Sequence, residues 1–260
     1  MLMKTNNLLN AALGAMMLIG CAASGANTAS GNNAPPTNTE PAANTQADNT
    51  PPVDTDPATA YATKDKPGTV KIVAAPELPR VAMKTAKGNF LIELYEDNTP
   101  NTVANFVYLV NKGHYKGSNF HRVLLGDPND GRSMRIIQGG VKGGKRSEEQ
   151  PEDFEWSIKN EATTQTYGSL KNTSGTIAMA RDKPIDTAGS QFYVNIHDHP
   201  HLNDPAKPYC VFGKVVEGMD VVKAIVKNDD IIDAWVVQKR DHKYVPVVKL
   251  AGKNNYGPLE

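Results

Sequence analysis

Short strand-like runs separated by turns dominate the sequence from Arg80 to Leu250, and this pattern constrains the fold more than any other feature. The runs are rich in β-branched, aromatic or aliphatic residues and end near glycines or polar turns. The first two flank Lys87-Gly88, which predicts a hairpin. In chain order the runs are 80–84, 89–95, 120–124, 134–138, 176–180, 192–196, 210–216, 231–238 and 244–250. About eight such strands in one domain predict a mainly β fold, a closed eight-stranded antiparallel barrel.

Two segments follow the helical period instead. Thr99-Pro100 opens the first, because proline suits the first helical turn and Thr99 is a candidate cap, and Gly113 ends it. Its apolar face consists of Val103, Phe106, Val107 and Val110. The second helix is predicted over 219–226, and its inward residues are Val222, Ile225 and Val226. We expect one helix at each end of the barrel. An eight-stranded barrel fills its own interior, so a binding groove must lie on its outer face.

Residues 1–20 are predicted to be a lipoprotein signal peptide. Residues 11–19 are apolar or small, a run too short to span a bilayer as a mature helix. Leu18-Ile19-Gly20-Cys21 resembles the bacterial lipobox, which implies cleavage before Cys21 and lipid attachment to it. The alternative is an ordinary signal peptide with an incidental cysteine. We favour the lipobox because the chain has only two cysteines, and the other, Cys210, is left without a disulfide partner.

Residues 21–76 are predicted to form a disordered tether that begins at the lipidated Cys21. Asn, Thr, Ala and Pro dominate it up to about residue 63, where Tyr61 is the only aromatic residue. Such a composition buries too little apolar area to offset the entropy of ordering. Residues 77–260 are then one folded domain.

Charge and metal-binding patterns narrow the function. The whole chain has 28 basic and 28 acidic residues and no basic stripe, which argues against nucleic acid as a partner. No cysteine–histidine spacing indicates a structural zinc site. His197, His199 and His201 alternate, but without nearby carboxylate or cysteine support we interpret them as a polar loop. We therefore expect no metal and no cofactor.

An arginine lies inside the strand-like run Phe120-His121-Arg122-Val123, where its charge is costly unless it faces a cleft and meets a partner. For this residue alone, an arginine at a strand edge is the simpler reading. Four more runs follow downstream: Ile136-Ile137-Gln138-Gly139-Gly140, Gly175-Thr176-Ile177-Ala178-Met179-Ala180, Gly189-Ser190-Gln191-Phe192-Tyr193 and Val211-Phe212-Gly213-Lys214-Val215. In this order and spacing, over about residues 80–250, the runs resemble the cyclophilin family of peptidyl-prolyl cis-trans isomerases.

The resemblance implies the same barrel with a helix at each end. It places Arg122 at the family's catalytic arginine and Gln138 at a residue that holds it. The substrate-binding positions that it implies are Phe120, Met134, Met179, Ala180, Arg181, Gln191, Tyr193, His201, Leu202 and Tyr209. Structural alternatives exist for several of them: packing for Phe120, core for Met179 and satisfaction of the backbone for Gln191.

The chain departs from the family pattern around the proline pocket. The insertion 127–133 lengthens the interval after the arginine, and Met134-Arg135 stands where the family has phenylalanine. Leu125 or Met134 is expected to fill the pocket instead. Three further departures are Arg181 for asparagine, Tyr193 for phenylalanine and His201 for the tryptophan of drug-sensitive members.

The resemblance predicts an isomerase that accelerates X-Pro rotation in exported proteins and assists their folding. Its partners are proline-containing segments of exported proteins and, through Cys21, a membrane of the cell envelope: periplasmic or outer membrane, or the extracellular face. We expect a monomer. The alternative is a weak or inactive module that binds proline-containing partners as a chaperone or adhesin, which the altered pocket favours. Arg122, Gln138 and Gln191 favour the enzyme.

Overall fold

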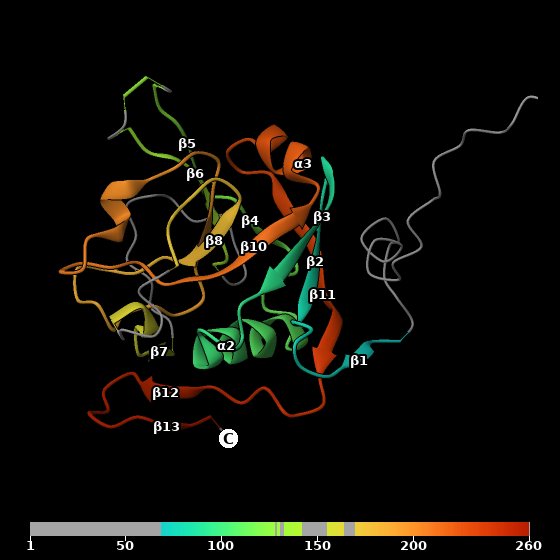
Figure 1. Cartoon of the computed structure of the whole chain (residues 1–260), viewed down its shortest axis with the longest axis vertical. Coiled ribbons are helices and arrows are strands. Elements are labelled where there is room, and N and C mark those ends of the chain that lie inside the picture. The colour runs from blue at the N-terminus through green and yellow to red at the C-terminus, as the bar shows by residue number, and fades with distance from the viewer. Residues whose placement is uncertain (1–68, 128, 131–132, 142–154, 164–169, 260) are drawn as a thin grey trace, which may run out of the picture. The chain divides into compact units, whose positions relative to one another are not determined.

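The structure is a computed structural model that describes residues 69–127, 129–130, 133–141, 155–163 and 170–259 (Figure 1). Its strands are β1 (Lys71–Val73), β2 (Arg80–Thr85), β3 (Gly88–Leu94), β4 (Ser118–Asn119), β5 (Arg122–Leu125), β6 (Arg135–Gly139), β7 (Trp156–Ile158), β8 (Thr176–Met179), β9 (Phe192–Asn195), β10 (Val211–Glu217), β11 (Asp230–Arg240), β12 (Val247–Leu250) and β13 (Gly257–Pro258). The helices are α2 (Pro100–Asn111), α3 (Met219–Ala224) and the 3₁₀ turns η1 (Glu161–Thr163) and η2 (Pro200–Asn203). The predicted mainly β fold with two α-helices is confirmed.

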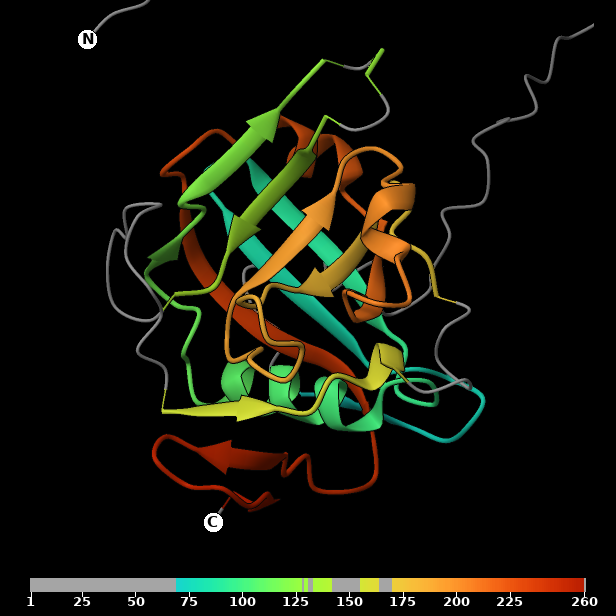
Figure 2. The same ribbon diagram turned by 90° about the vertical axis from the view of Figure 1, so that its left-hand side faces the viewer.

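The main sheet has ten strands, and nine of them form the path β1-β11-β2-β3-β10-β8-β9-β6-β5. Each run predicted to be a strand overlaps one of the observed strands, and β2 and β3 form the predicted hairpin, with Thr85 opposite Gly88. Figure 2 shows β5, β6, β9 and β8, coloured green to orange, side by side in front of β2 and β3. The helices α2 and α3 lie at opposite ends of these strands (Figure 1).

The predicted closed eight-stranded barrel is wrong in closure and in strand number. Among the described residues, the ladder path ends at β1 and β5, and β5 pairs only with β6. The tenth strand, β4, pairs with β11 over two residue pairs, and the chain then reaches β5 through Phe120 and His121, outside any strand. The backbone of Phe120 and His121 therefore links β4 to β5 without strand pairing, and Phe120 N–H donates to Asp229 O.

The first helix follows its predicted apolar face, because Val103, Phe106, Val107 and Val110 are all buried. Phe106 is the centre of an aromatic cluster, with ring centroids 5.2 Å from Tyr115, 5.8 Å from Phe192 and 5.1 Å from Phe212. These partners come from the segment after α2, from β9 and from β10. Phe106 thus fastens α2 to the interior of the sheet.

The cap of α2 differs from the prediction. The hydroxyl of Thr99 donates to Tyr95 O and makes no capping bond to the helix. Glu161, in η1, supplies the cap from 60 residues away: its carboxylate accepts from Asn101 N–H at 3.0 Å and from Thr102 N–H at 2.7 Å. A carboxylate at a helix N-terminus satisfies free N–H groups and meets the positive end of the helix dipole.

The second helix is shorter than predicted. α3 ends at Ala224, so Val226 lies beyond it and is 52 % exposed, whereas Val222 and Ile225 are buried as predicted. The inward assignment of Val226 is therefore wrong, because the chain leaves the helical period before reaching it.

A second sheet of three strands, in the order β13-β12-β7, lies beside α2 (Figure 2). The Asn101 side chain makes two hydrogen bonds to the backbone of Val247, and the indole N–H of Trp156 donates to Asn105 Oδ1. β7 and β13 escaped prediction because three and two residues are too few for a period-two pattern.

The ordered sheet begins before residue 77, where the sequence placed the start of the folded domain. β1 pairs in parallel with β11, with Lys71 opposite Gln238 and Val73 opposite Arg240. Val73 is buried. The first strand therefore comes from the end of the predicted tether.

We expect a chain that begins at residue 77 to be less stable than one that begins at residue 69. Loss of the buried Val73 side chain costs about 1.5–3 kcal/mol, and loss of β1 exposes the edge of β11. Thermal unfolding of the two chains measures the difference. Equal melting temperatures would show that β1 contributes nothing to the folded sheet.

The predicted signal peptide, Cys21 and the predicted tether as far as residue 68 lie outside the described residues. Within the described part of the chain, no helix is long and apolar enough to cross a membrane.

Candidate functional site

Four strands bring predicted catalytic and substrate-binding residues into one row with Ala178. Register pairs Arg122 of β5 with Gln138 of β6, Gln138 with Tyr193 of β9, and Tyr193 with Ala178 of β8. Residues directly opposite one another in a sheet point to the same face. The neighbours Val123, Ile137, Val194 and Ile177 point the other way and belong to the main core. The row therefore lies on the outer face of the sheet.

A chain of hydrogen bonds holds the arginine. Arg122 Nη1 donates to Gln138 Oε1 at 3.1 Å, and Gln138 Nε2 donates to Gln191 Oε1 at 3.0 Å. Gln191 is fixed in turn by its backbone, since Ala180 N–H donates to Gln191 O. Among the described residues, no carboxylate pairs with Arg122. Its remaining N–H donors have no acceptor among the described residues, so they can meet a ligand.

A second apolar cluster, separate from the main core, lies beside this row; we call it the outer-face cluster. Its buried members are Ile136, Ala178, Tyr193, Leu202 and Val211. Partly buried residues packed against it are Tyr95, Leu124, Met134, Leu170, Ala180 and Tyr209. The partly buried residues keep some apolar surface accessible, which suits an apolar ligand group.

Tyr193 is fixed at the centre of this cluster. Its hydroxyl donates to Asn172 Oδ1 at 2.7 Å, and Asn172 Nδ2 donates to Asn203 Oδ1 at 3.0 Å in the turn that carries Leu202. Burial, assisted by Tyr209 and Cys210, raises the pKa of Tyr193 well above its usual value. The hydroxyl is therefore a neutral donor that ties β9 to η2.

Met134, and not Leu125, occupies the altered position near the pocket. Leu125 is 61 % exposed, whereas Met134 packs against the outer-face cluster and its Sδ lies 3.2 Å from His201 Nε2. The sequence reasoning missed Ile136, which is buried in the cluster two residues before Gln138. Strand alternation alone places Ile136 on the face of Gln138, and this signal could have found it.

Two predicted binding residues do not reach the site. Phe120 and Met179 are buried in the main core, at 0 % and 1 % exposure. Met179 follows Ala178 on β8, so alternation turns its side chain inward. The packing alternative for Phe120 and the core alternative for Met179 are the ones that the structure supports.

The other predicted residues are gathered around the cluster. Leu202 belongs to it, and Ala180 and Tyr209 pack against it. The Tyr193 and Tyr209 rings meet edge to face, with their centroids 6.0 Å apart. The guanidinium of Arg181 lies over the Tyr209 ring, 4.2 Å from its centroid.

The alternating histidines form no metal site: nowhere in the described residues do three histidine, cysteine or acidic side chains converge for a metal ion. His199 Nε2 instead lies 3.0 Å from Arg135 O and 3.2 Å from Arg135 N. Burial lowers the pKa of His199, and His201 and His197 act in the same direction. His199 is therefore a neutral packing residue that ties the 197–201 loop to β6.

A family model described as cyclophilin-type peptidyl-prolyl cis-trans isomerase/CLD matches residues 80–250. The chain belongs to the cyclophilin family. The matched range contains every residue of the row and of the outer-face cluster.

Bacterial relatives carry the same activity in their names. This cyclophilin is 42 % identical over 152 residues to a peptidyl-prolyl cis-trans isomerase of Acinetobacter baylyi, covering 56 % of this chain and 70 % of the relative. It is 37 % identical over 150 residues to peptidyl-prolyl cis-trans isomerase B of Escherichia coli, covering 56 % and 82 %. A solved cyclophilin-type isomerase from Cryptosporidium parvum is 24 % identical, with a TM-score of 0.48 and coverage of 61 % and 97 %. Family and named relatives identify this cyclophilin as a peptidyl-prolyl cis-trans isomerase.

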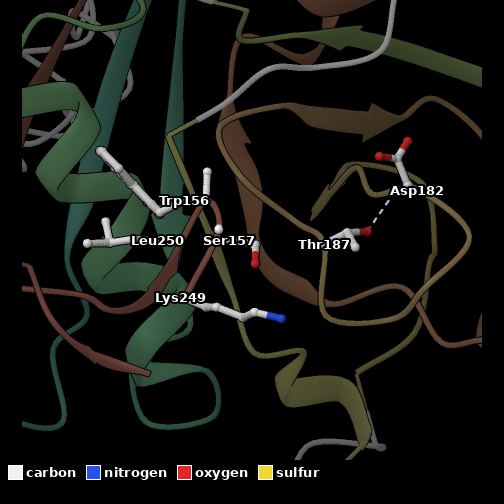
Figure 3. A pocket seen from close by; sticks show the side chains of 8 residues that line it. Trp156, Ser157, Asp182, Thr187, Lys249 and Leu250 are labelled. Atoms are coloured by element: carbon white, nitrogen blue, oxygen red, sulfur yellow. Dashed lines mark hydrogen bonds between the residues drawn. The ribbon is translucent and has the colours of Figure 1, made fainter. Parts of the chain in front are cut away.

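This cyclophilin also has a cavity of about 200 Å³, which Figure 3 draws from close by. The residues that line it are Trp156, Ser157, Asp182, Thr187, Lys249, Leu250, Ala251 and Gly252. Asp182 N–H donates to Thr187 Oγ1 at 2.9 Å across its far wall. It shares no residue with the row or with the outer-face cluster.

Proposed function

We propose that Arg122 is the catalytic donor of this isomerase and that the outer-face cluster receives the proline ring. The observation that carries the proposal is the hydrogen-bonded chain Arg122–Gln138–Gln191 at the border of that cluster. Rotation about an X-Pro bond is slow because it breaks amide resonance, with a barrier of ~18–20 kcal/mol. The reaction needs no nucleophile, because no covalent bond is broken.

The proposed mechanism combines a hydrogen-bond donor for the prolyl nitrogen with an apolar contact for the proline ring. As the bond twists, the lone pair localises on the prolyl nitrogen, and a guanidinium N–H of Arg122 donates to it. Gln138 holds the guanidinium before the substrate arrives, so little reorganisation is needed at the transition state. The proline ring packs against the cluster residues Ile136, Tyr193 and Leu202 in both the cis and the trans isomer. This contact supplies affinity without lowering the barrier to rotation.

The preorganised arginine favours this reading over a binding module that has lost its activity. A module that only holds proline segments needs the apolar cluster but has no use for a charged donor kept in place by two glutamines. Met134 and Ile136 also supply apolar walls where the family phenylalanine is missing. The rates of Arg122 variants test this reading directly.

We further propose that this isomerase acts on exported proteins from a lipid anchor in the cell envelope, as a monomer. The support is sequence evidence: the apolar run 11–19 followed by Leu18-Ile19-Gly20-Cys21, and the polar segment between Cys21 and the folded domain. One chain supplies every residue of the proposed site, so catalysis needs no second copy.

The replacement Cys21→Ser is expected to abolish lipid labelling and to release the protein from membranes. A single acyl chain binds a membrane only marginally, so retention depends on multiple acylation at this residue. Cells that express wild type or variant are labelled with a tagged fatty acid and fractionated, and Cys210→Ser serves as the matched cysteine control. If wild type takes up no label, or if the Cys21→Ser protein stays equally membrane-bound, the anchor does not exist.

A further inference from the structure

Arg181 is held rigidly between two segments that flank the outer-face cluster. Its Nε donates to Pro208 O at 3.2 Å and its Nη2 to Lys207 O at 2.8 Å. Its Nη1 donates to the carbonyls of Asp182 and Lys183, at 2.8 and 3.2 Å. A guanidinium has five N–H donors, and these contacts use four of them. One N–H on Nη2 has no acceptor among the described residues.

The guanidinium is also tied to the cluster through aromatic rings. It lies 4.2 Å from the Tyr209 centroid, and Tyr209 meets Tyr193 edge to face. Burial is the main cause of the raised pKa of Tyr193, and the positive charge of Arg181 acts in the opposite direction. Arg181 therefore sits at the edge of the site, with its position fixed by stacking and by hydrogen bonds.

The positive charge of Arg181 is not neutralised within the site. All four acceptors are neutral backbone carbonyls, and no carboxylate pairs with Arg181 within the described part of the chain. Arg122 is likewise without a carboxylate. Among the described residues, the two arginines are thus two positive charges beside an apolar cluster, neither of them paired with a carboxylate, and such charges attract negative groups.

The strand order sets the spacing of these two charges. Arg122 is on β5 and Arg181 follows β8, and the strands between them are β6 and β9. Three strand spacings are about 14 Å, which an extended peptide covers in about four residues. A peptide whose proline occupies the cluster beside Arg122 can therefore bring a side chain within about four residues of that proline to Arg181.

We propose that Arg181 makes this cyclophilin favour X-Pro segments that carry a glutamate or aspartate within about four residues of the proline. The inference rests on the proposed function, because it assumes that the peptide lies across the outer-face cluster. A carboxylate there accepts the free Nη2 hydrogen and meets a guanidinium that loses no further side-chain entropy on binding.

The test compares one proline peptide in matched forms that carry Glu, Gln or Lys at a single position, two or four residues before or after the proline. Affinity and kcat/KM are measured for each peptide with the full-length protein. For at least one position, we expect Glu to exceed Gln about two- to fivefold, as befits a partly exposed ion pair, and Lys to fall below Gln. The difference should lie mainly in KM and should shrink in 0.5 M salt.

Variants of Arg181 distinguish the effect of its charge on peptide binding from its structural role. Arg181→Gln should remove the advantage of the Glu peptide over the Gln peptide. Arg80→Gln is the control and should keep the Glu preference. Arg80 is on β2, and its guanidinium pairs with Glu93 of β3. Arg181→Lys keeps the charge without the fork that reaches four carbonyls, so it should keep part of the preference.

Equal values for the Glu and Gln peptides at every position would overturn the proposal. So would an Arg181→Gln protein that loses activity equally on all peptides together with melting temperature, because Arg181 would then only hold the two segments together. If wild type accelerates none of the peptides, the proposed mechanism fails. The measured affinities for Glu and Gln peptides still decide the charge preference in that case.

Discussion

Replacing Arg122 by alanine is expected to lower kcat/KM about 10²–10³-fold. The change removes the one charged donor in the row, and loss of a single preorganised donor typically costs ~2.7–4 kcal/mol of transition-state stabilisation. Affinity for a proline peptide should fall far less, because the outer-face cluster supplies most of the ground-state binding. The melting temperature should change little, since Arg122 is on the outer face and not in the core.

Two further variants identify the role of the arginine. Arg122→Lys keeps the charge but not the planar fork that meets Gln138, so it should recover only part of the rate. Gln138→Leu keeps the shape but frees the guanidinium, so it should lower the rate by less than Arg122→Ala does. A near-wild-type rate for Arg122→Ala would remove this residue from the mechanism. Equal losses of rate and peptide affinity would make it a binding residue only.

Replacing Phe106 by alanine is expected to destabilise the fold by about 3–5 kcal/mol, the usual cost of deleting a buried phenylalanine side chain. Phe106 is fully buried, and its ring meets those of Tyr115, Phe192 and Phe212. The cavity would open where α2 meets the sheet, so the surrounding rings can relax only partly. Denaturant unfolding of wild type and variant measures the difference.

Matched controls make the stability test specific. Phe106→Leu should cost clearly less, because it keeps most of the apolar volume. Val226→Ala should change stability by no more than about 0.5 kcal/mol, because this side chain is largely exposed. A Phe106→Ala protein as stable as wild type would contradict the position of Phe106 at the centre of the core.

The sequence was most informative where a local period decides the structure. Alternation locates the strands, the helical period locates α2 and its buried face, and Gly88 marks the hairpin turn. The same alternation, applied to β8, would have turned Met179 inward and Ala178 outward. Arg122, Gln138 and Gln191 were predicted together from their motifs, and the structure joins them by hydrogen bonds.

Long-range contacts could not be predicted because no local pattern encodes them. Glu161 caps α2 from a distant segment, and β1 pairs with β11, far away in the sequence, although its three residues carry no pattern of their own. The bond from Tyr193 to Asn172 likewise joins β9 to the segment that precedes β8. The prediction of a closed barrel was wrong because the short passage from β4 to β5 interrupts the ladder, and no local pattern marks that interruption.

The most direct test of the account is cis–trans exchange of an X-Pro peptide, measured by two-dimensional NMR with substoichiometric full-length protein. Wild type, Arg122→Ala and the control Arg80→Gln are compared, and peptide affinity is titrated for each protein. The account predicts rapid exchange with wild type and Arg80→Gln, and exchange about 10²–10³-fold slower with Arg122→Ala at similar bound fraction. Exchange at the wild-type rate with Arg122→Ala, at equal bound fraction, would contradict it.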